Sequence, residues 1–171
     1  DGSAPTTGTL SSATGNTGIG KSAFAALTSG TYNTAYGYSA LAALTTGGSN
    51  VAIGKDALKT ITTSSGNIAV GLQAMEVTTS GNANVAIGHL AMNVNTTGSS
   101  NTAVGYQALD ANTEGEGNTA LGSGALTDNT TADFNTAVGK TALTDNTTGY
   151  GNTASGKDAM KLNTTGYYNS A

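Results

Sequence analysis

Hydrophobic and polar positions along this chain recur with a period of 17 residues. Counted from the asparagine that opens each repeat, position 8 is alanine and position 9 is leucine, methionine or phenylalanine. Position 5 is glycine and position 13 is threonine in all nine complete repeats. A period without insertion or deletion is typical of a repeat solenoid, in which one small structural unit is stacked on the next. We number the positions from the asparagine that opens each repeat: Asn16, Asn33, Asn50, Asn67, Asn84, Asn101, Asn118, Asn135, Asn152 and Asn169.

The first five positions of each repeat are expected to form a short strand. Positions 2 and 4 are mostly threonine, valine, isoleucine or leucine, which favour pleated backbone and share one face of a strand. The odd positions hold asparagine, alanine and glycine, and such small residues permit the close approach of another layer. The predicted fold is therefore a parallel β-roll or β-helix with one short strand in each coil.

Positions 6 to 12 are expected to form a short helical turn. Positions 5, 8, 9 and 12 follow the i, i+3, i+4, i+7 spacing of one helical face, as in Gly88, Ala91, Met92 and Asn95. Apart from Asp1, every charged residue lies at position 6, 7, 10, 11, 14 or 16. Positions 13 to 17, typically Thr-Thr-Gly followed by two variable residues, are expected to turn the chain back towards the next strand.

A helix in every coil conflicts with the spacing of the strands. Adjacent parallel strands lie ~4.8 Å apart, whereas packed helices need ~8–10 Å. Three arrangements resolve the conflict. The helix is a looser turn in a flat roll, or the stack curves, or several chains intertwine.

The opening asparagines are candidates for a structural ladder. Stacking places their side chains above one another, where the amides can satisfy each other's donors and acceptors. A simple turn or strand-start role is the alternative. The predicted ladder comprises Asn33, Asn50, Asn67, Asn84, Asn101, Asn118, Asn135 and Asn152.

Four asparagines at position 12 are candidate N-glycosylation sites. Asn95, Asn129, Asn146 and Asn163 each begin the acceptor sequence Asn-Thr-Thr. The competing interpretation, which we favour, is that Asn-Thr-Thr is turn chemistry, because asparagine can end a helix in the left-handed conformation.

Composition and charge narrow the classes of partner. The chain of 171 residues has 25 glycines, no cysteine and a formal net charge of −4, so no basic patch is expected to bind nucleic acid. Apolar runs are too short for a membrane span. The absence of cysteine leaves the redox compartment open.

The motifs that suggest catalysis are weak. Residues 15–22 fit the phosphate-binding pattern G-x-x-x-x-G-K-[ST], but the same segment recurs in other repeats and follows from the columns. His89 is the single histidine, at a position where lysine and tyrosine also occur, so no transition-metal cluster is expected. We predict no enzyme activity, no catalytic or metal-binding residues and no cofactor.

The repeat core resembles known repeats. Asn50-Val51-Ala52-Ile53-Gly54 is similar to the core of YadA-like head domains in trimeric autotransporter adhesins. The unit 101–117, which begins Asn-Thr-Ala-Val-Gly-Tyr-Gln-Ala-Leu, resembles repeats of phage tail-fibre and large bacterial surface proteins. The resemblance covers residues 16–171 and implies a parallel β-fibre, usually homotrimeric, outside the cell or on a virion.

The expected organisation is an N-terminal extension (1–15), nine repeats (16–168) and the start of a tenth (169–171). One hypothesis is that the extension completes the last coil of a neighbouring copy, giving a head-to-tail filament. We expect an extracellular, cell-surface or virion-surface fibre subunit, acting as shaft, spacer or adhesin stalk. Its expected partner is itself, as a homotrimer or polymer, with surface glycans as further candidates. The alternative is a glycan- or ice-binding module.

Overall fold

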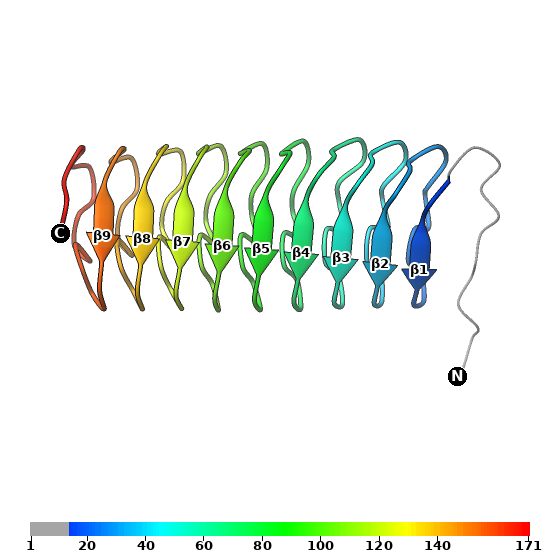
Figure 1. Ribbon diagram of the computed structural model, residues 1–171, viewed down its shortest axis with the longest axis horizontal. Coiled ribbons are helices and arrows are strands. Elements are labelled where there is room, and N and C mark those ends of the chain that lie inside the picture. The colour runs from blue at the N-terminus through cyan, green and yellow to red at the C-terminus, as the bar shows by residue number, and fades with distance from the viewer. Residues whose placement is uncertain (1–13) are drawn as a thin grey trace.

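A computed structural model, which describes residues 14–171, shows a rod built from one coil after another (Figure 1). Every coil contributes one strand of three residues, at positions 2 to 4 of its repeat. The strands are β1 (Thr17–Ile19), β2 (Thr34–Tyr36), β3 (Val51–Ile53), β4 (Ile68–Val70), β5 (Val85–Ile87), β6 (Thr102–Val104), β7 (Thr119–Leu121), β8 (Thr136–Val138) and β9 (Thr153–Ser155).

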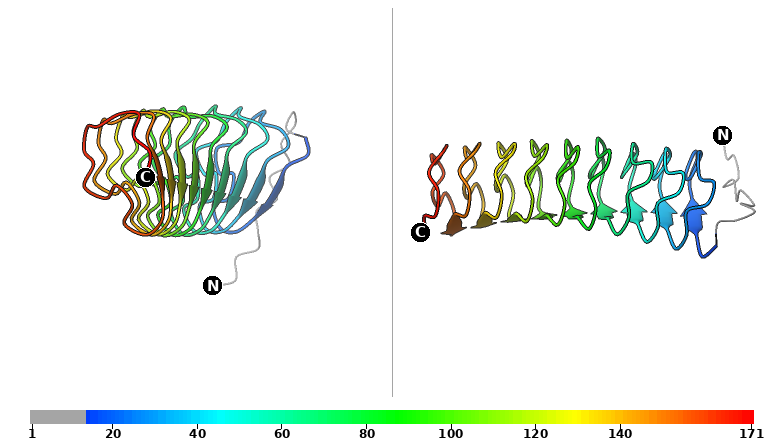
Figure 2. Two further views of the ribbon diagram at one scale, coloured as in Figure 1. Left: turned by 60° about the vertical axis from the view of Figure 1, so that its left-hand side comes forward. Right: turned by 90° about the horizontal axis from the view of Figure 1, so that it is seen from above.

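The strands form one parallel sheet in chain order, from β1 to β9. Each residue pairs with the residue at the same position of the next repeat, as Ala103 does with Ala120 and Val104 with Leu121. The predicted parallel β-solenoid is confirmed. Because consecutive strands of one chain pair directly, the coils form a simple stack, with no strand between them (Figure 2).

The core lies inside the coils and is made of columns. Position 3 of the repeat is the middle residue of the strand, and from β2 to β9 it is an alanine that points inwards, opposite the alanine of position 8 and the large side chain of position 9. In the fifth coil these residues are Ala86, Ala91 and Met92, and none of them has any exposed surface. Only small residues allow the two sides of a coil to approach this closely, which explains the alanine columns.

The predicted helical turn is wrong, since the described residues contain no helix and positions 6 to 12 are a series of turns. The backbone is left-handed at positions 7 and 9, as at Leu90 (φ 58°) and Met92 (φ 51°). The amide of Met92 donates to the carbonyl of Ala108 in the next coil at 2.9 Å, so hydrogen bonds run between coils. This looser turn is compatible with a strand spacing of ~4.8 Å, whereas stacked helices would need ~8–10 Å between their axes.

Turns within each coil reproduce the inward spacing that suggested a helix. The amide of Ala91 donates to the carbonyl of Gly88, and that of Asn95 to the carbonyl of Met92, both at 3.3 Å. Two successive tight turns therefore direct positions 8, 9 and 12 into the core.

The glycine at position 5 allows the chain to leave the strand. Gly88 has a φ of 138°, and a Cβ atom at this site would collide with the carbonyl oxygen of Gly105 in the next coil. A side chain is thus excluded both by conformation and by space.

At the C-terminal end, residues 169–171 continue the stack. Ser170 forms a parallel bridge with Thr153, and the amide of Ser155 donates to the carbonyl of Ala171 at 2.8 Å. Residues 1–13 lie outside the described residues, and with them nearly all of the segment in the filament hypothesis.

Candidate functional site

The asparagines at position 1 form a continuous buried ladder along the rod. The backbone amide of each donates to the side-chain Oδ1 of the asparagine one coil earlier, as Asn118 does to Asn101 at 2.8 Å. Its Nδ2 crosses the coil to the carbonyl at position 15, which for Asn118 is Ala132 at 2.8 Å. In several steps Nδ2 also bonds to the preceding Oδ1, as in Asn50 to Asn33 at 3.0 Å. The ladder residues Asn33, Asn50, Asn67, Asn84, Asn101, Asn118, Asn135 and Asn152 have no exposed surface.

This ladder connects the two ends of each coil as well as neighbouring coils. One asparagine supplies an acceptor to the next coil and a donor to its own closing turn, so both its Oδ1 and its Nδ2 are hydrogen-bonded inside the buried core. The role is structural, because neither the oxygen nor the nitrogen is left to meet a ligand.

The candidate glycosylation sites lie in a second ladder, at position 12. The Nδ2 atoms of Asn129 and Asn146 donate to the preceding Oδ1 at 2.9 and 3.2 Å. Each Nδ2 also donates to the position 15 carbonyl of its own coil, as Asn95 does to Gly98 at 2.8 Å. Asn95, Asn129 and Asn146 are buried, and Asn163 is half-buried at the last coil.

A glycan is attached to the asparagine Nδ2, the atom that these hydrogen bonds occupy. A sugar at Asn129 would require the buried amide to leave the ladder and the coil to open. The arrangement favours the structural interpretation of Asn-Thr-Thr over the modification.

The phosphate-loop-like segment 15–22 contains a strand. Thr17–Ile19 is β1, and the amide of Thr17 donates to the carbonyl of Asn33 at 2.9 Å. A phosphate loop needs free amides that converge on an anion, whereas this backbone is paired with the next coil. Lys21 is exposed at position 6.

His89 is also exposed at position 6, and its ring lies 5.5 Å from the ring of Tyr106 between centroids. Among residues 14–171 there is no group of three or more histidine, cysteine, aspartate or glutamate side chains that could hold a metal ion. The same residues include no helix of the length and hydrophobicity needed to cross a lipid bilayer.

Asp56 is the one buried carboxylate among the described residues, and two lysines surround it. Its oxygens lie 2.8 Å from Nζ of Lys55 and 3.3 Å from Nζ of Lys59. Burial alone would raise the pKa of Asp56, but hydrogen bonds and charge from both lysines outweigh it and lower the pKa below 3.8. Lys59 also contacts Glu76 of the next coil at 3.3 Å, so this cluster joins two coils.

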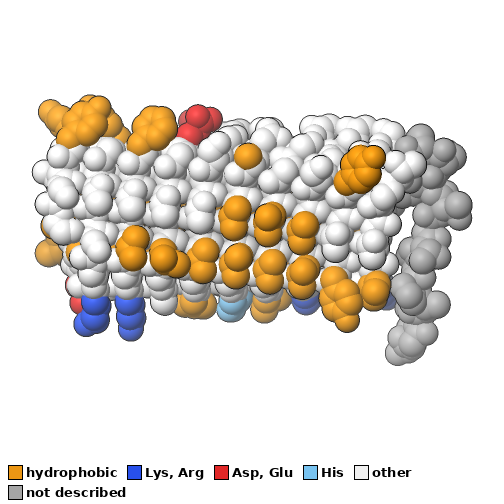
Figure 3. All heavy atoms as spheres, viewed as in Figure 1, with side chains coloured by type: hydrophobic (Ala, Val, Ile, Leu, Met, Phe, Trp, Pro, Cys, Tyr) orange, Lys and Arg blue, Asp and Glu red, His pale blue; other side chains and the backbone are white. Residues whose placement is uncertain are grey.

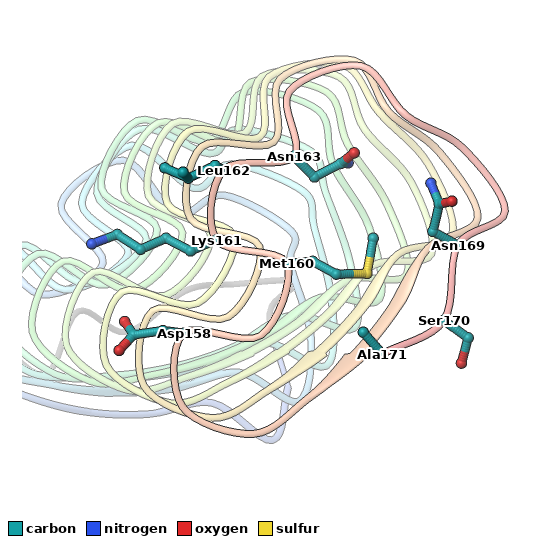
Figure 4. A pocket seen from close by; sticks show the side chains of 8 residues that line it. All are labelled: Asp158, Met160, Lys161, Leu162, Asn163, Asn169, Ser170 and Ala171. Carbon is teal, nitrogen blue, oxygen red and sulfur yellow. The ribbon is translucent and has the colours of Figure 1, made fainter.

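A hollow at the C-terminal end is the uncovered underside of the last coil (Figure 4). Met160 and Asn163 point into it from positions 9 and 12, which the next coil covers elsewhere in the rod. The hollow therefore exists because no further coil covers positions 9 and 12 at this end of the described residues. Its lining comprises Asp158, Met160, Lys161, Leu162, Asn163, Asn169, Ser170 and Ala171.

Two uncharged rows of side chains, at positions 2 and 4, cover the side of the sheet that points away from the core. We call this side the outer face (Figure 3). Aliphatic side chains are widely exposed there: Ile53 is 40% exposed, Ile87 41% and Leu121 47%. The sequence contained the signal for this surface, since no charged residue occupies position 2 or 4 in any repeat.

Tyrosines gather near the C-terminal end, and the sequence interpretation missed them. The rings of Tyr150 and Tyr167, at position 16 of successive coils, are stacked with centroids 5.2 Å apart. Their common position in the repeat was the signal that could have predicted the contact.

Comparison with protein-family models, curated proteins and solved structures found no match to this chain.

Proposed function

We propose that this protein is the subunit of an extracellular structural fibre, as a shaft, spacer or adhesin stalk, and that copies associate through the outer face. The observation that carries the proposal is the outer face itself, uncharged along all nine strands. The cell surface or a virion surface is the proposed location.

The interior supports a mechanical role. The ladder residues repeat without interruption, so the load on one coil passes to the next through backbone and amide hydrogen bonds. Little of the interior is available for chemistry, because the buried polar side chains are mostly hydrogen-bonded to the backbone and to one another.

The outer face supports association between copies. Nine strands at ~4.8 Å spacing give a strip about 40 Å long, with two side-chain rows ~7 Å apart. Exposed contiguous apolar surface of this kind usually marks an interaction site in a soluble protein. Rows of β-branched side chains on a pleated sheet also suit packing against a second sheet, at about 10 Å.

The proposal is tested by electron microscopy and light scattering on tag-free protein, with charges introduced on the outer face. The double variant I53K/I87K places two lysines on the face, whereas T63K/T97K places them at exposed position 14 of the same two coils. We expect oligomers or laterally associated fibres for the native protein and for T63K/T97K, and single rods for I53K/I87K. Single rods of the native protein at every concentration would contradict the proposal.

A second candidate function, ice binding, is favoured by one observation. Position 2 holds threonine in four successive coils, and strand pairing places the four side chains in register: Thr102, Thr119, Thr136 and Thr153. Regular rows of hydroxyl and methyl groups on a flat sheet can order water. Thermal hysteresis of the native protein, lost in T119K/T136K, would support this function instead of the fibre.

A further inference from the structure

Three tyrosines form an exposed cluster over the last two complete coils. Tyr150 and Tyr167 stack with an interplanar angle of 5°, while Tyr168 stands edge-on to both, with centroids 5.1 and 6.0 Å away. Tyr150 is 42% exposed, Tyr167 59% and Tyr168 74%.

The cluster is distinctive among the tyrosines of this chain. Of the seven, the other four are Tyr32, Tyr36, Tyr38 and Tyr106. Within residues 14–171 the one ring contact outside the cluster joins Tyr106 to His89, so no other pair of tyrosine rings touches.

The geometry disfavours a platform for sugar rings. Sugars stack on open aromatic faces that lie side by side, whereas Tyr150 and Tyr167 each cover one face of the other and Tyr168 packs edge-on against both. All three tyrosines are widely exposed, and the phenol groups and ring edges of an exposed tyrosine are the parts that react with oxidants.

We infer that Tyr150 and Tyr167 are a site of oxidative cross-linking, joined as dityrosine by a peroxide acting with a peroxidase. Each phenol loses one electron and one proton to give a phenoxyl radical. The two radicals combine through a bond between ring carbons ortho to the hydroxyls, and each coupled carbon then loses its hydrogen as the phenols re-form. In total, two tyrosines and one hydrogen peroxide give one dityrosine and two molecules of water.

Register makes this pair efficient partners. The two residues occupy position 16 of adjacent coils, which the ladder bonds from Asn152 to Asn135 hold together. The bonds from Asn169 to Asn152 link the two chain segments just after the tyrosines. Two groups fixed at contact distance react as if each were present at very high local concentration. The inference does not depend on the proposed fibre function, since the pair lies within one chain.

The cross-link would covalently tie the last complete coil to the one before it. That coil has no complete coil beyond it among the described residues, and Asp158, Lys161 and Leu162 are exposed there. We expect slower amide hydrogen exchange in residues 152–168 after oxidation.

Lysine-specific digestion of oxidised protein provides the test. Cleavage after Lys140, Lys157 and Lys161 separates Tyr150, in peptide 141–157, from Tyr167 and Tyr168, in peptide 162–171. Dilute protein is treated with peroxidase and hydrogen peroxide, monomers are isolated, and the digest is analysed by mass spectrometry. We expect the two peptides joined with the loss of two hydrogens, together with dityrosine fluorescence.

Phenylalanine variants identify the pair while keeping the rings. Y150F should abolish the joined peptide and Y167F should reduce it by roughly tenfold or more, in line with the loss of a pre-positioned partner. Y168F and Y106F should leave it unchanged. The inference is overturned if the isolated monomer yields no joined peptide, or if Y167F forms as much of it as the native protein.

Discussion

The ring of Phe24 occupies the space into which an alanine side chain at Gly18 would project. A Cβ atom on Gly18 would lie 2.7 Å from Cδ2 of Phe24, closer than two carbon atoms pack without movement. Both residues are exceptions in their columns, since position 3 is otherwise alanine and position 9 is otherwise leucine or methionine. The two exceptions therefore compensate for each other in volume within one coil.

This compensation predicts a strong coupling between the two sites. Gly18→Ala alone should destabilise the N-terminal coils by about 1–2 kcal/mol through overpacking. Gly18→Ala combined with Phe24→Leu restores the consensus pair and should recover most of that loss. Denaturant unfolding of both single variants and the double variant measures the coupling. Simple additivity of the two effects would show that the contact does not matter.

The left-handed backbone at position 9 predicts an unusual preference among aliphatic side chains. Leu109 is fully buried with a φ of 54°, a region where β-branched residues are disfavoured. Leu109→Ile should cost about 1–3 kcal/mol of stability, whereas Leu109→Met should cost under about 1 kcal/mol. Equal losses for both variants, measured by denaturant unfolding, would contradict the backbone argument.

Thr78 marks the junction between two kinds of core and carries an unpaired polar atom. Position 12 is aliphatic in the first three coils and asparagine from Asn95 onward. Thr78 is buried, and its Oγ1 has no hydrogen-bond partner. Thr78→Val keeps the shape and removes the unsatisfied hydroxyl, so it should stabilise the protein by about 1 kcal/mol. Thr97→Val, at an exposed site, is the matched control and should change stability by less than ~0.5 kcal/mol.

The repeat period made much of this architecture predictable. A constant spacing of 17 places identical residues in register, which is enough to predict the strands, the parallel sheet and the stacking of Asn118 on Asn101. The turn was not predictable from periodicity, because Gly88, Ala91 and Met92 face inwards with helical spacing on a non-helical backbone. The absence of isoleucine and valine at buried position 9 was the clue to that backbone.

The candidate site was less accessible to sequence reasoning. The motif Asn-Thr-Thr at Asn129 is the same whether its amide is free or buried, and only the inward direction of position 12 distinguishes the two. The stacking of Tyr150 on Tyr167 follows from the period. The edge-on contact of Tyr168 depends on side-chain rotation, which a period does not specify.

The cluster around Asp56 predicts acid sensitivity. Because the pKa of Asp56 is lowered in the folded protein, its contribution to stability is present above its ordinary value of 3.8 and is lost as the pH falls below that value. Unfolding should therefore become easier in this acidic range. In Asp56→Asn the decline in stability should be shallower than in the native protein. Parallel curves for the native protein and Asp56→Asn would remove Asp56 as the cause.

Stacking in register predicts that whole coils can be removed, but not with equal ease. Deletion of residues 84–100 brings Gly117 next to Ala83, a pairing without a bulky side chain, and should leave a shorter folded rod. Deletion of residues 101–117 removes Gly117, which lies beside the ring of Phe134 in the native protein, and puts Ser100 in its place. A Cβ atom on Gly117 would be 2.7 Å from Cδ1 of Phe134, so this deletion should cost about 1–3 kcal/mol more than the first.

The control for these deletions removes only 16 residues, 84–99. Every repeat position after the junction is then shifted by one residue relative to the coils before it. Because neighbouring strand positions face opposite sides of the sheet, this shift would turn the alanine column outwards and the β-branched rows into the core. We expect the two 17-residue deletions to fold, by circular dichroism and hydrogen exchange, and the 16-residue deletion to lose the coils around the junction. Equal folding of all three would mean that the register of the columns does not determine the stack.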